Sequence, residues 1–283
     1  MSDFLDDMIT RRTERIAAEF GALSPADCER LASCARPVRD FAAALRDRND
    51  VAIIAEVKKA SPSAGSIAPD CEASKQALHY QRGGAAAVSV LTEPELFGGS
   101  FADLSDVADA VDLPVLCKDF VVNPVQLFAA RGHGADAVLL MVSVLGADIG
   151  EYIDLATTLG LMPLVEVAGP SELFVALGAG ASVIAVNSRD LHTLEVDVEA
   201  ARSVVAEAKR AGAVVVAASG VKGRREVLTA ASAGADAVLV GETLMRAPFP
   251  EETLEELTGV HKAPGANKEA TGVAGDKGGI HHA

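Results

Sequence analysis

Short apolar runs rich in β-branched residues recur along the chain at a nearly even interval. Within each run the hydrophobicity is almost continuous rather than alternating, which is typical of parallel strands covered on both faces. The pattern therefore predicts a series of buried parallel strands, eight in all: Val51–Val57, Ala85–Leu91, Pro114–Lys118, Ala135–Val142, Leu161–Val167, Ser182–Asn187, Ala213–Ser219 and Asp236–Gly241.

Helical patterns separate these runs. Val198–Ala211 has apolar residues at helical spacing, and Pro170–Ala179 opens with the Pro-Ser-Glu of a helix start. Three segments repeat one phrase, GGAAAVSVL, GADAVLLMV and GADAVLVGE, in which glycine ends a helix and a strand follows directly. Eight strands alternating with helices over about 210 residues predict an α/β protein with a closed (β/α)8 TIM barrel. A doubly wound open sheet is the competing arrangement, but this spacing favours closure.

The two ends of the chain differ from the barrel pattern. Residues 1–50 carry two amphipathic patterns, around Phe4–Phe20 and Val38–Arg46, which predict an N-terminal helical extension that caps the barrel. The catalytic barrel itself is expected over residues 51–261. Residues 262–283 are rich in Gly, Ala and Lys without an apolar period, so we expect a disordered tail.

Composition narrows the possible partners and locations. Lys and Arg number 25 against 40 Asp and Glu, a formal net charge of −15, which argues against binding to a nucleic-acid backbone. The N-terminus lacks the apolar core of a signal peptide, and no stretch approaches the roughly 18 apolar residues of a membrane span. We therefore expect a cytoplasmic protein that binds neither nucleic acid nor membrane. A local cluster of cations could still hold a small anionic substrate.

Cysteine and histidine give no sign of a metal or cofactor site. The four cysteines, Cys28, Cys34, Cys71 and Cys117, form no CxxC pair, and Cys117 lies in an apolar run where a buried thiol is the ordinary interpretation. The six histidines show no metal-ligand spacing, and no dinucleotide GxGxxG signature is present. We predict that no metal and no cofactor is required.

Polar side chains stand where several strands end, which is where active sites of such barrels lie. They are Glu56 and Lys58, Lys118 and Asp119, Glu166, and Asn187 with Arg189. Charged groups are costly to bury unless they are paired or used. Glu56 and Lys58 are two residues apart and share one face of a strand, whereas Lys59 should face away and be structural. One such residue alone is ordinarily a solvent-exposed side chain at the rim of the barrel. The occurrence of such residues at four strand ends predicts a catalytic cluster instead.

Glycines after the last two strands point to phosphate. Ser219-Gly220 and Gly241 follow them, and loops at these places often bind phosphate through backbone N–H groups. Lys58 could add a cation to the same phosphate. The alternative is that these glycines only make tight turns.

The segments AEVKKASPSAG, VLTEPELFGGS, PVLCKDF, ADAVLLMV, PLVEV, VNSRDL, ASGV and VLVGETLM occur in an order and spacing that resembles the indole-3-glycerol phosphate synthase family. The resemblance covers about residues 1–258. It implies a decarboxylating and dehydrating ring closure of 1-(2-carboxyphenylamino)-1-deoxyribulose 5-phosphate in tryptophan biosynthesis. The substrate is the partner that it implies, and contact with other enzymes of the pathway is left open.

The resemblance also implies roles for individual residues. Lys118 would be the general acid that protonates the ketone oxygen, and Lys58 a second cation and candidate acid for the dehydration. Glu166 would stabilise the cationic intermediate or act as base, Glu56 would orient the lysines and Asn187 would hold the substrate. The matching binding positions are Arg189 for the carboxylate side, Ser61 after the lysine motif, Phe97, Phe120, Leu139, Leu191 and Val240 around the aryl ring, and Ser219, Gly220, Gly241 and Glu242 for phosphate.

One position departs from the family pattern. The family usually reads Glu-Ser-Gly after the seventh strand, whereas Ala218 precedes Ser219-Gly220 here. The departure implies weaker or shifted activity, a different substrate or an engineered change. Two other functions compete with the synthase. A phosphosugar isomerase would use a Cys and Asp pair, which Cys117 disfavours because it precedes Lys118 and should point the other way. A catalytically silent binding barrel has only Ala218 in its support.

Overall fold

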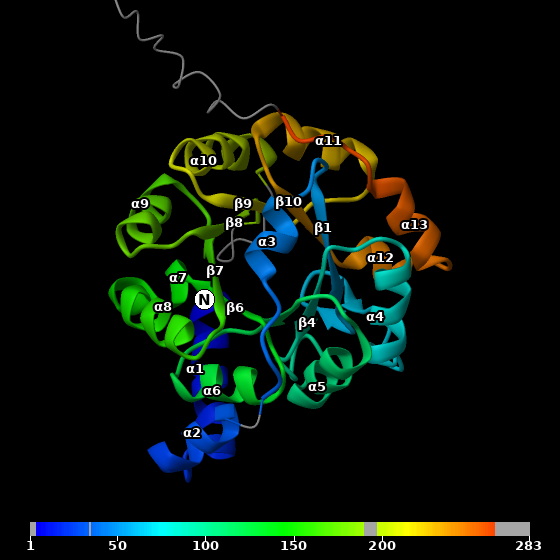
Figure 1. Cartoon of the computed structure of the whole chain (residues 1–283). Coiled ribbons are helices and arrows are strands. Elements are labelled where there is room, and N and C mark those ends of the chain that lie inside the picture. The colour runs from blue at the N-terminus through cyan, green and yellow to red at the C-terminus, as the bar shows by residue number, and fades with distance from the viewer. Residues whose placement is uncertain (1–3, 34, 190–196, 264–283) are drawn as a thin grey trace, which may run out of the picture.

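The computed structural model describes residues 4–33, 35–189 and 197–263, and its centre is a closed barrel of eight parallel strands. Neighbouring strands pair in the order β1-β10-β9-β8-β7-β6-β5-β4, and β4 closes the barrel on β1 (Figure 1). Each strand lies inside one of the eight predicted runs, so the TIM-barrel prediction is confirmed. The strands are β1 Ala52–Val57, β4 Ala87–Leu91, β5 Val115–Lys118, β6 Ala137–Met141, β7 Met162–Val167, β8 Val183–Asn187, β9 Val214–Ala218 and β10 Ala237–Val240.

Helices form a ring around the strands (Figure 1). The ring helices are α4 Ala73–Arg82, α5 Phe101–Ala110, α6 Val125–Gly132, α8 Ile149–Thr158, α9 Pro170–Gly178, α10 Val198–Arg210, α11 Arg224–Ala233 and α13 Pro250–Leu257. Shorter elements are the β2 Ala60–Ser61 and β3 Gly65–Ser66 hairpin, α7 Val142–Leu145, the 3₁₀ turn η1 Gly146–Asp148 and α12 Glu242–Arg246. Helices α9 and α10 each end one residue before the predicted bounds, which were Pro170–Ala179 and Val198–Ala211. Capping side chains begin several helices, as when Ser100 accepts from the Asp103 N–H.

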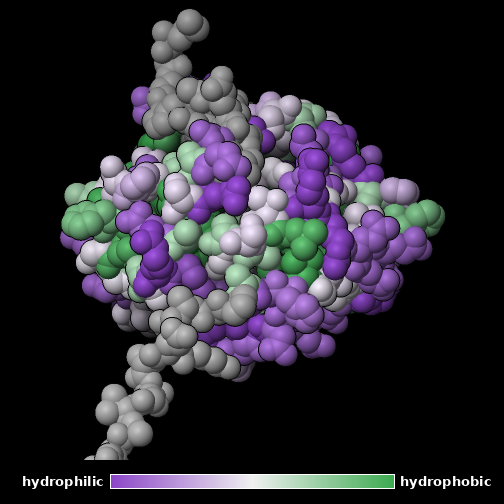
Figure 2. Space-filling view, turned by 90° about the horizontal axis from the view of Figure 1, so that it is seen from above, coloured by the Kyte–Doolittle hydropathy of each residue, from purple (hydrophilic) through white to green (hydrophobic). Residues whose placement is uncertain are grey.

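Alternate residues of the strands face two separate cores. Ile53 and Val57 pack outward with ring-helix residues such as Leu104, whereas Ala52 and Ile54 belong to a core inside the barrel. This two-sided burial explains the nearly continuous apolar runs. The outer surface is mostly hydrophilic with small hydrophobic patches on the side seen in Figure 2. No helix in the described part of the chain is long and apolar enough to cross a membrane.

The N-terminal extension covers both ends of the barrel. Helix α1 Phe4–Phe20 has the predicted bounds, and its residues Leu5 and Met8 share the inner core with Phe120 beyond β5. Helix α3 Phe41–Arg46 crosses the opposite, amino-terminal opening (Figure 1) and starts later than its pattern, because Asp40 caps it. Helix α2 Pro25–Ser33, which has no buried residue of its own, was not predicted. The predicted boundaries at 50/51 and 261/262 stay predictions, and residues 264–283 lie outside the described residues.

The repeated GADAV phrase marks one structural position on two strands. Asp136 and Asp236 are both buried, and each accepts a backbone N–H from the preceding barrel strand, that of Val115 at 2.8 Å and that of Val215 at 2.9 Å. The extension and the C-terminal segment attach here. Arg36 donates to Asp136 at 2.6 Å, and Lys262 lies 3.7 Å from Asp236. These two carboxylates thus tie the segment before α3 and the C-terminal segment to the amino-terminal rim of the barrel.

We expect the Asp136→Leu substitution to lower the free energy of unfolding by roughly 3–5 kcal/mol, because it leaves the buried Val115 N–H without its acceptor and Arg36 without its carboxylate partner. Asp136→Asn keeps one acceptor oxygen and should cost less. Urea denaturation measures both values. The exposed Asp47→Asn variant is the control, expected within about 0.5 kcal/mol of the starting protein. Equal stability of the Asp136→Leu and Asp47→Asn variants would contradict the anchoring role.

Candidate active site

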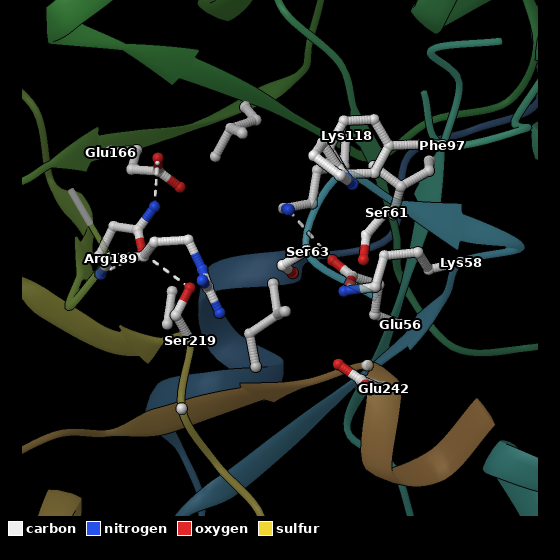
Figure 3. A pocket seen from close by; sticks show the side chains of 18 of the residues that line it. Glu56, Lys58, Ser61, Ser63, Phe97, Lys118, Glu166, Arg189, Ser219 and Glu242 are labelled. Carbon is white, nitrogen blue, oxygen red and sulfur yellow. Dashed lines mark hydrogen bonds and ion pairs between the residues drawn. The ribbon is translucent and has the colours of Figure 1, made fainter. Parts of the chain in front are cut away.

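A cavity of about 540 Å³ opens at the carboxyl ends of the strands, where the polar residues were predicted to gather (Figure 3). Strand ends and the loops that follow them supply its walls. The predicted site residues that line it are Glu56, Lys58, Ser61, Phe97, Lys118, Phe120, Leu139, Glu166, Asn187, Arg189, Ser219, Gly220, Gly241 and Glu242. Sequence reasoning therefore placed most of the site in one cavity.

A buried carboxylate binds two lysines at the floor of the cavity. Glu56 is 1% exposed, and its two oxygens lie 2.7 Å from Lys58 Nζ and 3.1 Å from Lys118 Nζ. Burial alone would raise the pKa of Glu56, but the charges of Lys118 and Lys58 lower it to about 2. Burial likewise opposes the charge of Lys118, yet Glu56 and Glu166 raise its pKa above the ordinary value. Both lysine partners of Glu56 therefore face a permanent anion, and Lys118 stays protonated at neutral pH.

Gly241 makes this cluster possible. A Cβ atom at position 241 would lie 2.3 Å from Glu56 Oε1 and 3.1 Å from Lys58 Nζ. No real side chain tolerates the first of these distances, so any other residue would displace the carboxylate. The glycine predicted from a phosphate pattern thus also has a packing reason, the close approach of β10 to the Glu56–Lys58 pair.

Glu166 lies across the cavity from Glu56 and Lys58 (Figure 3). It lies near the carboxyl end of β7 and is 7% exposed. Its carboxylate accepts a hydrogen bond from Asn187 Nδ2 at 3.0 Å. Burial raises its pKa, and the lowering effect of Lys118 does not offset this. A carboxyl group with a raised pKa opposite a protonated lysine can exchange protons with a bound molecule.

Asn187 connects Glu166 to the turn after β9. Its Oδ1 accepts from Ser219 Oγ at 2.7 Å and from the Arg189 N–H at 3.0 Å. Ser219 has φ 68°, the left-handed region, and is the non-glycine residue with positive φ among those described. Ala218 pairs in register with Asn187 and adds only a methyl group to the cavity wall.

Aromatic side chains form the opposite wall. The rings of Phe97 and Phe120 have centroids 6.2 Å apart. Glu93 shapes the loop that carries Phe97, because its buried carboxylate accepts the N–H groups of Glu95, Leu96 and Phe97 at 2.8 to 3.1 Å. The two rings, tilted by 45° to each other, thus present an apolar surface to the cavity.

Several lining residues escaped sequence reasoning. Phe4 comes from the first turn of α1, and Glu93, Lys222 and Arg246 lie on loops or at a helix end. Glu93 occurs in the quoted segment VLTEPELFGGS, so that segment was the available signal. Nothing in the sequence pattern connects Phe4 to a barrel mouth.

One predicted site residue faces away from the cavity, and another lies outside the described residues. Val240 belongs to the outer core, and its neighbour Leu239 lines the cavity instead, so the assignment of Val240 to the aryl pocket is wrong. Successive residues of a strand face opposite sides, and the prediction was out of register by one. Leu191 lies outside the described residues.

Two sequence predictions about neighbours of the lysines are confirmed. Lys59 binds Asp103 at 2.7 Å on the side of the barrel and does not line the cavity. Cys117 faces the outer core, and burial raises the pKa of its thiol to about 12. Among the described residues, no group of His, Cys, Asp and Glu is arranged to hold a metal ion.

A closed (β/α)8 barrel with lysines and carboxylates gathered at the carboxyl ends of its strands defines an enzyme of the TIM-barrel class. A family model described as indole-3-glycerol phosphate synthase matches residues 5–257. Because that match covers most of the chain, the protein belongs to the indole-3-glycerol phosphate synthase family.

Curated relatives agree with this assignment. The chain is 44% identical over 261 residues to "Indole-3-glycerol phosphate synthase 1" of Streptomyces coelicolor. That alignment spans 92% of this chain and 96% of the relative. It is 43% identical over 262 residues to the indole-3-glycerol phosphate synthase of Beutenbergia cavernae, spanning 92% and 97%. Both alignments include nearly the whole of each protein.

Solved structures support the fold. A mutant tryptophan synthase α-subunit of Pyrococcus furiosus superposes with a TM-score of 0.58 at 17% identity, covering 74% of this chain and 98% of that chain. The thiamine phosphate pyrophosphorylase of the same organism gives 0.56 at 17% identity, covering 77% and 96%. At such identities the likeness concerns the barrel alone.

The buried Glu56 makes stability depend on pH. Its pKa in the fold is about 2 against an ordinary 4.5, so its contribution is present above about 4.5 and is lost as the pH falls toward 2. We expect Glu56→Gln to be less stable than the starting protein by roughly 3 kcal/mol at pH 6, with a shrinking difference as the pH falls below 4.5. Urea denaturation at several pH values measures this. A difference that does not depend on pH would contradict the ionised state of Glu56.

Proposed function

We propose that the chain catalyses the ring closure of 1-(2-carboxyphenylamino)-1-deoxyribulose 5-phosphate to indole-3-glycerol phosphate, with release of carbon dioxide and water. The observation that carries the proposal is the Lys58–Glu56–Lys118 cluster with Glu166 opposite, in a cavity with an aromatic wall. Family membership supports a carbon–carbon lyase of tryptophan biosynthesis.

Lys118 acts first in the proposed mechanism. Its protonated Nζ donates a proton to the ketone oxygen of the substrate while the aryl carbon that bears the carboxylate attacks the carbonyl carbon. Glu56 orients Lys118 and keeps it charged until the substrate oxygen takes the proton. The new carbon–carbon bond leaves positive charge on the aryl-nitrogen system, which Glu166 stabilises across the cavity.

Decarboxylation and dehydration complete the reaction. Loss of carbon dioxide returns the electron pair of the carbon–carboxylate bond to the ring. The hydroxyl group formed from the ketone then leaves as water, with Lys58 as the acid that protonates it. Glu166 accepts the proton released when the indole double bond forms, and its raised pKa suits that role.

The remaining lining residues hold the substrate. The backbone after β9 at Ser219-Gly220 and after β10 at Gly241-Glu242 surrounds the phosphate, and Lys58 adds a cation. The aryl ring lies against the aromatic wall, next to Leu139, and Arg189 binds the substrate carboxylate. Ser61 and Asn187 contact the polar chain between the two ends.

The competing functions find less support. An isomerase with a Cys and Asp pair would need a thiol in the cavity, whereas Cys117 faces the outer core. A silent binding barrel would not require protonated Lys118 opposite Glu166. For the location of the protein we propose the cytoplasm, and we propose no nucleic-acid or membrane partner and no cofactor.

Turnover of this substrate tests the proposal directly. Formation of the indole product raises fluorescence, and Lys118→Ala should lower kcat by about 10²- to 10⁴-fold because the ketone loses its proton donor. The control is Lys75→Ala, which removes an exposed lysine of α4 that does not line the cavity and should leave kcat unchanged. Absence of turnover by the unaltered chain would sink the assignment.

Ala218 gives a second test. Ala218→Glu places a carboxylate beside Asn187, within the reach of substrate hydroxyl groups, and we expect kcat/KM to rise by about tenfold, the effect of one hydrogen bond to a charged group. Ala218→Gln is the matched control, since it has the same size without the charge and should gain less. Equal values for all three proteins would show that the missing carboxylate does not limit the reaction.

A further inference from the structure

A buried ion pair joins helix α1 to the residue that follows Lys118. Arg12 Nε donates to Asp119 Oδ1 at 2.8 Å and Nη2 to Oδ2 at 2.5 Å, and both side chains are 1% exposed. Arg12 lies on the buried face of α1 with Leu5, Met8 and Ile16. The N-terminal helix thus contacts the catalytic edge of the barrel through a two-pronged bond between residues 107 positions apart.

The same carboxylate connects to the neighbouring strand. Thr92 Oγ1 donates to Asp119 Oδ2 at 2.8 Å, and the Thr92 N–H donates to the Lys118 carbonyl at 3.0 Å. Arg12, Asp119 and Thr92 therefore enclose the backbone of Lys118 between β4 and α1. We call these three residues the clamp.

Lys118 needs such a clamp because its strand is weakly held on the other side. Strand β5 pairs with β6 only at Leu116 and Cys117, so the ladder on that side stops one residue before Lys118. On the β4 side the pairing continues to Leu91 and Lys118. The position of the Lys118 backbone is thus set by β4 and by the clamp rather than by β6.

Stability alone does not account for the clamp. Replacing a buried ion pair by well-packed apolar residues is often neutral or stabilising. Arg12 Nη1 is also buried without a hydrogen-bond partner, which is a further cost. Burial raises the pKa of Asp119 despite Arg12, so this carboxylate depends on the guanidinium to stay ionised. The Arg12–Asp119 bond costs stability, and its place beside Lys118 indicates that its role is to orient Lys118.

We infer that Arg12 is a positioning residue for the general acid: through Asp119 it fixes the backbone of Lys118, so that Nζ meets both Glu56 and the substrate oxygen. The kinetic part of this inference rests on the proposed function. Arg12 is absent from the cavity lining, whereas Asp119 belongs to it, so Arg12 acts on the site through Asp119. Its effect should therefore appear in kcat rather than in KM.

The experiment compares Arg12→Met, Arg12→Lys and Asp119→Asn with Arg11→Met. Arg11→Met is the matched control, because it makes the same change one residue away on the same helix, where the side chain is 54% exposed. Kinetics are measured well below the thermal midpoint of each variant. If Arg12→Met does not fold, Arg12→Lys and Asp119→Asn make the same comparison.

We expect Arg12→Met to lower kcat by about 100-fold with little change in KM, as for a catalytic group displaced by about 1 Å. Arg12→Lys keeps the charge and one bond, so it should fall in between, and Arg11→Met should match the starting protein. The double variant Arg12→Met/Asp119→Asn should be no slower than the slower single variant, because both act on one bond. A folded Arg12→Met with unchanged kcat, or losses that add, would overturn the inference.

A readout without turnover separates this inference from the proposed function. Brief treatment with an amine-acylating reagent, followed by peptide mass spectrometry, measures how fast Lys118 reacts relative to the exposed Lys75. We expect Lys118 to react several-fold faster in Arg12→Met than in Arg11→Met, because it loses its fixed place against Glu56. Unchanged reactivity would overturn the positioning role even if the chain turned over another substrate. If the unaltered chain does not turn over the proposed substrate but Lys118 shows the expected change in acylation rate, only the proposed function is contradicted.

Discussion

The buried carboxylate of Glu56 is the constraint on which the site depends. It cannot stay ionised inside a barrel without cations, and the two lysines that it binds come from its own strand and from β5. Gly241, which follows the adjoining β10, must lack a side chain for the carboxylate to fit. One buried charge thus fixes the relative positions of three strands. It also keeps Lys118 protonated and in place, which is what a proton donor to a ketone needs.

The strand pattern made most of this predictable from the sequence. Parallel strands covered on both faces give continuous apolar runs, so a polar residue at the end of such a run stands out, as Glu56 and Glu166 do. Period-two alternation then separates Lys118, which lines the cavity, from Cys117, which faces the ring helices. Because the carboxyl ends of all eight strands meet at one edge, residues far apart in the sequence could be assigned to one site.

Other features depend on contacts that no local pattern contains. The shift from Val240 to Leu239 shows that alternation fails when the end of a strand is misjudged by one residue. Phe4 and the Arg12–Asp119 pair come from a helix whose amphipathic pattern indicates that it packs, but not against which surface. The hydrogen bond from Ser219 to Asn187 occurs at the left-handed turn after β9, where Ser219 has positive φ. Serine rarely adopts positive φ, so the sequence did not indicate this turn.

The substitution at position 218 changes the charge balance of a mouth built inside an acidic protein. The net charge of −15 repels a substrate that carries phosphate and carboxylate, so local cations must overcome that field. A methyl group beside Asn187 leaves Lys58, Lys118 and Arg189 less opposed, which favours binding of the anionic substrate. The same change removes an acceptor that could orient hydroxyl groups during the reaction. Only interactions that are stronger in the transition state than in the bound substrate raise kcat, so the loss of that acceptor outweighs the gain in substrate affinity.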